Sequence, residues 1–208
     1  MTHPDSPQAL LPPPTDQLCL DFANTLFWRG TAPPEETLRA PDDLLAWLEG
    51  AGQPGAGTAR AHWNATPGAA ETAHHTALDL RETIYRVLAG PDPTPDDLAI
   101  LNRALAAAPE RRHLERTADG WAWRAASWSP TLPYLLAPVL WSAADLLAGP
   151  RRGRVRTCAN PRCRWLFLDD SKAGTRRWCM MSACGNRAKA HRHYAKVRAS
   201  RQGNRALN

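Results

Sequence analysis

The sequence predicts an α+β fold that is mainly α: a helical N-terminal domain with a small β-hairpin, followed by a small cysteine-rich module that ends in a basic helix. Three observations support this prediction. Apolar residues recur at helical spacing through most of the first 150 residues, except in one segment near residue 120 that alternates with a period of two. Four of the five cysteines stand in two pairs near the C-terminus. Residues 151–208 carry 16 Lys and Arg against two Asp, whereas residues 1–150 carry 10 basic and 18 acidic residues.

These contrasts divide the chain into a proline-rich flexible tail (1–14), a helical domain (15–150) and a basic module (151–208). In the first expected helix, Leu18, Phe22 and Leu26 lie four residues apart, and Asp16 is a suitable N-cap. A glycine-rich stretch at 50–68 is expected to be a flexible connection. The expected helices cover about 17–28, 41–48 and 73–88, one begins at Thr94-Pro95, and the last covers 132–147 with a kink at Pro138.

The small β-hairpin is expected within residues 112–127. Asp119-Gly120 favours a tight turn, and Trp121, Trp123 and Ala125 alternate onto one face after it. Together with Trp128, the two tryptophans could wall an aromatic pocket, but packing of the hairpin on the helices is the favoured interpretation. Cys19, between two leucines, is expected to be a buried thiol.

The cysteine spacing is the most specific pattern in the chain. Cys158-x4-Cys163 is followed, 15 residues later, by Cys179-x4-Cys184. Two such pairs on short loops form a tetrahedral site of four thiolates, for which one structural zinc ion is the usual occupant. A polar module of this size buries too little apolar surface to fold alone, and a zinc site supplies roughly 10–16 kcal/mol of apparent folding free energy. An iron–sulfur cluster is the alternative, but the spacing differs from that of ferredoxins.

The rest of the zinc-ribbon-like module predicts contact with a polyanion. A strand is expected at 164–168, Gly185 is expected to turn around the metal, and Asn186 is the expected N-cap of the basic helix. Residues of one charge dominate the module and aromatic residues interleave with them, which favours nucleic acid as the partner. The predicted nucleic-acid contacts are Arg187, Lys189, Arg192 and Lys196, followed in rank by Arg176, Arg177 and Arg198.

The module resembles the CGNR zinc-finger family in Cys158, Cys163, the run Trp-Leu-Phe-Leu-Asp at 165–169, Arg176-Arg177-Trp178-Cys179, and Cys184-Gly185-Asn186-Arg187 followed by Lys189. The upstream segment LCLDFANTL at 18–26 is similar to the start of the domain paired with that finger, called ABATE. The resemblance covers nearly the whole chain. It implies a bacterial stress-induced transcription regulator with a zinc finger for nucleic acid and an N-terminal domain for sensing or regulation. With this resemblance, DNA is expected as the partner in preference to RNA.

Other residues suggest how such a regulator is controlled. Asp21 and Asn24 lie one turn apart in an apolar segment and, with Arg81, are candidates for binding a small-molecule effector. The more ordinary interpretation is that the first two satisfy backbone groups of a crossing segment, and that Arg81 and Glu82 form a salt bridge. Because one finger has a small footprint, specific binding is expected to need a homodimer through the N-terminal domain.

Several classes of protein are disfavoured. The longest apolar stretch, at 132–147, is too short and too interrupted to cross a membrane, and the N-terminus lacks the features of a secretory signal. Cysteines arranged for a metal fit a reducing compartment, so a cytoplasmic location is expected. No catalytic motif is present, so an enzyme is not expected. The remaining alternatives are an RNA-binding zinc protein, a redox-responsive zinc protein and a protein-interaction adaptor.

Overall fold

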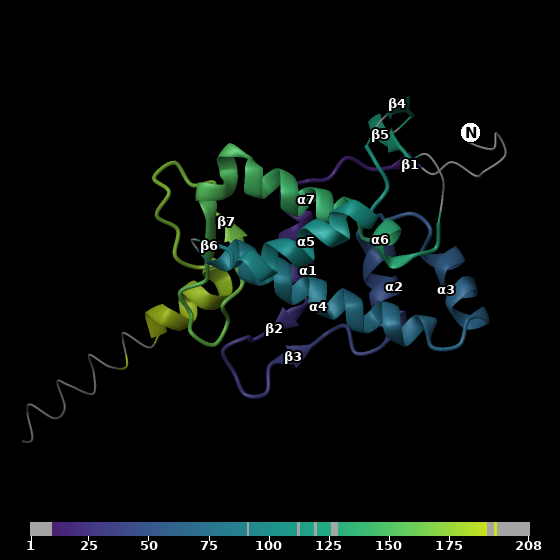
Figure 1. Cartoon of the computed structure of the whole chain (residues 1–208). Coiled ribbons are helices and arrows are strands. Elements are labelled where there is room, and N and C mark those ends of the chain that lie inside the picture. Colours follow the sequence, from purple (N-terminus) through teal and green to yellow (C-terminus); the bar gives the residue numbers. More distant parts are fainter. Residues whose placement is uncertain are drawn as a thin grey trace, which may run out of the picture.

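The computed structural model describes residues 10–90, 92–111, 113–118, 120–125, 129–190 and 194. Within these residues the fold is mainly helical with small antiparallel sheets, as the sequence predicts (Figure 1). The helices are α1 (Leu18–Ala23), α2 (Pro41–Gly50), α3 (Ala56–Ala65), α4 (Ala69–Ala89), α5 (Pro95–Ala107), α6 (Leu132–Leu135) and α7 (Ala137–Ala148). The strands are β1 (Leu10–Leu11), β2 (Leu26–Phe27), β3 (Glu35–Glu36), β4 (His113–Thr117), β5 (Gly120–Arg124), β6 (Val155–Thr157) and β7 (Leu166–Leu168).

The short helix α1 lies at the centre of the helical body, in contact with α4 and α7. Four of its six residues are buried, among them Leu20 and Phe22 with no exposed surface. Cys19 is also fully buried, as predicted, and burial raises the pKa of its thiol to about 12. The helix α4, with 21 residues, is the longest described helix. Its buried face contacts α1, α2, α3 and α5. Within the described residues, none of the helices combines the length and the apolarity that a membrane crossing requires.

The predicted end of the first helix and its predicted cap are both wrong, and in each case a polar side chain makes a tertiary contact instead. The first helix ends at Ala23 and not near residue 28, because the chain turns at Asn24 and then forms β2, which pairs with β3. Asp16 does not cap it, since the N-cap is Gln17 without a side-chain bond. The Asp16 carboxylate accepts a hydrogen bond from Arg151 at 2.7 Å.

The stretch 50–68 is not simply a flexible connection, because it contains α3. Ala56, Ala59 and Trp63 form the buried face of this helix and pack toward α2 and α4. Three of the five glycines in this stretch, at 52, 55 and 57, lie before or within the first turn of α3, and Gly55 supplies a left-handed N-cap with φ 91°. A single tryptophan and small alanines therefore bury a helix whose sequence has little apolar periodicity.

The other helices agree with the sequence. Thr94 caps α5 by accepting a hydrogen bond from the Asp97 backbone at 3.1 Å, as its position before Pro95 predicts. The expected kink near Pro138 appears as a break at Leu136 between α6 and α7. The break falls there because Pro138 lacks an N–H and is tolerated only in the first turn of a helix.

The predicted hairpin is present as β4 and β5, and it gains a third strand that the sequence did not predict. β1, in the segment expected to be a loose tail, pairs antiparallel with β5, giving the order β1-β5-β4. The expected turn residue Asp119 and the third tryptophan, Trp128, lie outside the described residues. Trp123 packs against the core, but Trp121 is 53% exposed, so of the two described tryptophans the expected packing holds for Trp123.

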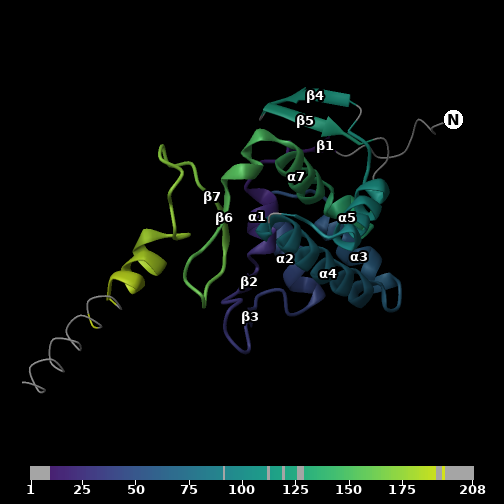
Figure 2. The same ribbon diagram turned by 60° about the vertical axis from the view of Figure 1, so that its left-hand side comes forward.

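The strands β6 and β7 form an antiparallel hairpin that lies against the ends of α1 and α4 (Figure 2). A 3-10 helix, η1 (Pro150–Arg154), connects α7 to it. Residues 181–190 lie on the side of this hairpin that faces away from the helical body. The hairpin is therefore placed between the helices and the C-terminal helical segment.

Candidate metal centre and its attachment to the helices

The four paired cysteines meet in one buried cluster. The Sγ atoms of Cys158, Cys163, Cys179 and Cys184 all lie within 4.8 Å of one another, and each residue is at least 93% buried. The Sγ of Cys179 is 3.7 Å from that of Cys163 and 3.8 Å from that of Cys184. A regular tetrahedron with Zn–S bonds of about 2.3 Å has sulfur–sulfur edges of about 3.8 Å. The donor set and its spacing therefore fit one tetrahedral zinc ion.

The crowding of the sulfur atoms means that all four can ionise only with a cation bound between them. The contact with Cys179 lowers the pKa of Cys163 to about 5, and that contact, together with burial, raises the pKa of Cys179. Burial also raises the pKa of Cys184. Thiolates this close together repel one another, so only a bound cation allows all of them to ionise. With four protein ligands around zinc, no position remains open for a reacting water, and the centre is structural.

Turns on both sides hold the cysteines in place. Asn160 organises the first loop: its carbonyl accepts a hydrogen bond from the Cys163 backbone at 2.9 Å, and its side-chain amide donates to the Sγ of Cys184 at 3.3 Å. On the second side, η2 (Met181–Gly185) is one turn of π-helix that continues directly into residues 186–190. A Cβ at Gly185 would approach the Met181 sulfur to 2.6 Å, so a larger residue there would require the exposed Met181 side chain to move.

Three predictions about this module need correction. Gly185 is absent from the residues with positive φ, so it does not serve a left-handed turn. Asn186 is not an N-cap, because the helical turn already begins at Met181. The strand begins at Leu166 rather than at Arg164, whose left-handed φ of 57° interrupts extended backbone.

The strand β7 faces two hydrophobic clusters at once. Leu166 and Leu168 belong to the core that the helices form, whereas Phe167 between them packs with the four cysteines. Because successive side chains of a strand point to opposite faces, three residues suffice to join the two clusters. Trp28, Trp165 and Trp178 complete the cluster around the cysteines.

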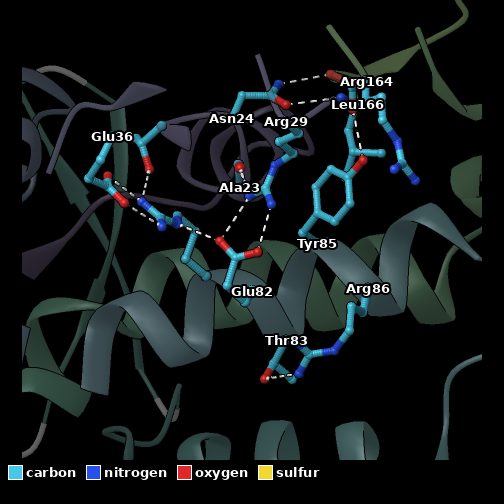
Figure 3. A network of polar contacts seen from close by, with 12 residues as sticks. Ala23, Asn24, Arg29, Glu36, Glu82, Thr83, Tyr85, Arg86, Arg164 and Leu166 are labelled. Carbon is cyan, nitrogen blue, oxygen red and sulfur yellow. Dashed lines mark hydrogen bonds and ion pairs between the residues drawn. The ribbon is translucent and has the colours of Figure 1, made fainter. Parts of the chain in front are cut away.

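Polar contacts reinforce this attachment. The Asn24 side chain makes two hydrogen bonds of 2.9 Å with the backbone of Leu166, donating to its carbonyl and accepting from its N–H (Figure 3). The Tyr85 hydroxyl donates to the Arg164 carbonyl at 2.9 Å. Arg152 donates to backbone carbonyls at the C-terminal end of α4, which that helix cannot satisfy itself.

Two family models match the chain. The ABATE model, described as "Putative stress-induced transcription regulator", matches residues 16–150. The chain belongs to the ABATE family. The second model, the CGNR zinc finger, matches residues 154–197, so both resemblances seen in the sequence are confirmed. A search of the curated proteins finds no match. The four buried cysteines are the zinc site of the CGNR finger.

The contact between Asn24 of the ABATE domain and Leu166 of the finger leads to a prediction. Asn24→Ala leaves both backbone groups of a buried residue without partners, at a cost of roughly 1–3 kcal/mol each. We expect the free energy of unfolding of the zinc-loaded protein to fall by about 2–4 kcal/mol in chemical denaturation. Asp21→Ala, one turn earlier on the exposed side of α1, is the matched control and should stay within about 0.5 kcal/mol of wild type. Equal, small losses of unfolding free energy in the two variants would show that the Asn24–Leu166 contact does not stabilise the protein.

The candidate effector residues do not form one site. Asp21 is exposed and accepts a hydrogen bond from Gln17 at 2.8 Å, whereas Asn24 is engaged by Leu166. Arg81 is 3% exposed and makes paired hydrogen bonds of 2.6 and 2.7 Å with Glu36 of β3. Its Nε donates to Glu82 at 3.0 Å, as the alternative salt-bridge interpretation anticipated.

Glu82 in turn joins Arg81 to Arg29. Arg29 donates to both carboxylate oxygens of Glu82, at 2.6 and 3.1 Å, and to the Ala23 carbonyl at 2.7 Å. Its guanidinium lies 3.8 Å from the centroid of the Tyr85 ring. Figure 3 shows this network between α4 and the segment that follows α1. Sequence spacing gives no indication of it, because Arg29, Glu36 and Glu82 come from three separate segments of the chain.

The predicted nucleic-acid residues fall into three groups. Arg177, Arg187 and Lys189 are exposed on the finger. Arg176 instead donates to the carbonyls of Leu168, Trp178 and Cys179 and lies 4.6 Å from the Phe167 ring centroid, so it supports the metal site. Arg192, Lys196 and Arg198 lie outside the described residues.

Proposed function

We propose that this protein is a DNA-binding transcription regulator, without catalytic activity, whose CGNR finger contacts DNA. The observation that carries the proposal is the position of the finger's cations. Arg187 and Lys189 are exposed on the helical segment 186–190, which points away from the ABATE helices (Figure 2). The metal fixes the start of that segment through Cys184, so the cations are presented on a rigid support.

In this proposal the ABATE domain supplies regulation. One finger offers a small surface to DNA, so a homodimer through the ABATE domain is needed for a site of useful length. The domain would sense a small-molecule effector, and the contacts of β6 and β7 with α1 and α4 give such an effector a route to the finger. Arg81 and Asn24 belong to that route by their contacts with Glu36, Glu82 and Leu166.

The experiment measures the binding of zinc-loaded protein to duplex genomic fragments over a range of salt concentrations, with RNA as competitor. The double variant Arg187→Ala, Lys189→Ala removes two expected phosphate contacts. We expect its log–log slope of affinity against salt to be shallower by about 2, since each phosphate contact contributes roughly 0.9. Arg116→Ala, an exposed arginine on β4 of the ABATE domain, is the control and should leave the slope unchanged.

An unchanged slope in the double variant would contradict the assignment of this surface. Recovery of one common motif among the bound duplexes supports a sequence-specific regulator. Loss of all duplex binding in the presence of RNA would instead favour RNA as the partner.

A further inference from the structure

A cleft of about 460 Å³ lies in the finger beside the cysteine cluster. One side is formed by the first cysteine loop, including Asn160 and Arg162, and the other by Arg177, Trp178 and Arg187. A volume of this size falls within the roughly 300–1,000 Å³ of small-molecule sites. Contacts with phosphates need only an exposed cationic surface. They therefore do not account for a cleft of this size beside the cations.

The cations around this cleft differ from most of the finger's other described arginines. Arg162, Arg177 and Arg187 have no carboxylate partner and no hydrogen-bond acceptor for their side chains among the residues that the structure describes. By contrast, the arginines at 151, 152, 154, 156 and 176 all donate to protein oxygens. Guanidinium groups whose donors remain available, and which converge on one hollow, form a site for phosphate oxygens.

An aromatic ring completes the cleft. Trp178 is half-buried, packs on the cysteine cluster and lines the cleft. The Arg177 guanidinium lies 5.4 Å from its ring centroid, and that of Arg187 lies 5.0 Å from the centroid of Trp28. The Trp28 backbone is itself fixed near the finger, because Gly30 two residues later donates to the Arg162 carbonyl at 3.1 Å. The ring and two of the cations, Arg177 and Arg187, are thus positioned by aromatic contacts before any ligand binds.

We propose that this cleft binds one unstacked nucleotide, with its base against Trp178 and its phosphates on the three arginines. The proposal rests on the proposed function, since it requires that the finger bind nucleic acid. Bases of an intact duplex are stacked and cannot enter a hollow, whereas a base of a single strand, or one turned out of a duplex, can. The finger should therefore prefer DNA that presents an unpaired base. The test uses separate probes for a base in a single strand and for an unpaired base in a duplex.

The test compares three fluorescent probes with the full-length zinc-loaded protein: a 15-nucleotide single strand, its blunt duplex, and that duplex with one central unpaired base. We expect Trp178→Ala to weaken binding of the single strand by at least about fivefold, which is the lower end for loss of one base–aromatic stack. The duplex with one unpaired base should lose affinity equally if bases are captured from duplexes, and the blunt duplex should change by less than twofold. Trp178→Phe should retain most of the affinity, and Trp121→Ala, which removes an exposed tryptophan of β5 outside the finger, should have no effect.

A second measurement uses only the wild-type protein, in case Trp178→Ala loses its zinc. Each base of the single strand is replaced in turn by an abasic site, and one position should lose at least about fivefold. Uniform small losses at every position, or equal losses by Trp178→Ala on all three probes, would overturn the cleft while leaving the proposed function intact. If the wild-type protein binds none of the probes in a salt-dependent manner, the proposed function itself fails.

Discussion

Chelation of the zinc is expected to unfold the CGNR finger and to destabilise the ABATE helices with it. A structural zinc site contributes roughly 10–16 kcal/mol of apparent free energy, which is of the same size as the total stability of about 5–15 kcal/mol of an ordinary domain. The loss reaches the helices because β7 carries Phe167 on the cysteine cluster and Leu166 and Leu168 in the helical core. If β7 detaches when the cysteine cluster unfolds, Leu166 and Leu168 leave the helical core with it and expose its apolar side chains.

The measurement is the zinc content per chain, together with thermal unfolding followed by circular dichroism, before and after excess chelator at pH 7. We expect one zinc ion per chain and a fall in the melting temperature of the whole protein. Cys179→Ala should reproduce the chelated state. Cys19→Ala, which truncates the fifth buried thiol outside the cluster, should keep its zinc ion. A helical body that melts at the same temperature with and without the metal would show that the two clusters fold independently.

The cysteine cluster was predictable because its chemistry depends on residue type and spacing alone. Two pairs, each with an x4 gap, have few uses in a basic segment other than a metal, and the four sulfur atoms do converge. Thr94 before Pro95 was equally informative, because an N-cap is a local hydrogen bond. Predictions of this kind need no knowledge of the tertiary structure.

The features that the sequence did not reveal are those that depend on distant contacts. Asn24 ends α1 early because its partner, the Leu166 backbone, is 142 residues away in the chain. The helix α3 is stabilised by burial of Trp63 against neighbouring helices, although its sequence is rich in alanine and glycine. The cleft residue Arg162 was not among the predicted nucleic-acid contacts, because only the folded loop brings it near Arg187. Arg176 was among them, yet carbonyls that surround it in space engage its donors.

Glu82→Gln is expected to destabilise the ABATE domain strongly. The carboxylate balances Arg29 and Arg81, whose side chains are only 7% and 3% exposed. Removing one partner of a buried ion pair costs roughly 3–5 kcal/mol. The Glu82 side chain is itself 33% exposed, so we expect a loss of about 3 kcal/mol, at the lower end of that range. Glu71→Gln, the same change on an exposed residue of α4, should cost only about 0.3–1 kcal/mol.

The pH dependence separates loss of charge from loss of packing. Burial raises the pKa of Glu82, but the hydrogen bonds and charges of Arg29 and Arg81 outweigh it and hold the pKa below its usual value. A carboxylate with a lowered folded-state pKa stabilises the fold above its unfolded-state pKa of about 4.3, and that contribution is lost as the pH falls through the folded-state value. The difference in unfolding free energy between wild type and Glu82→Gln should therefore be constant from about pH 6 to 8 and shrink in acid. A difference that stays the same below about pH 4 would mean that the shape of the side chain, and not its charge, holds Arg29 in place.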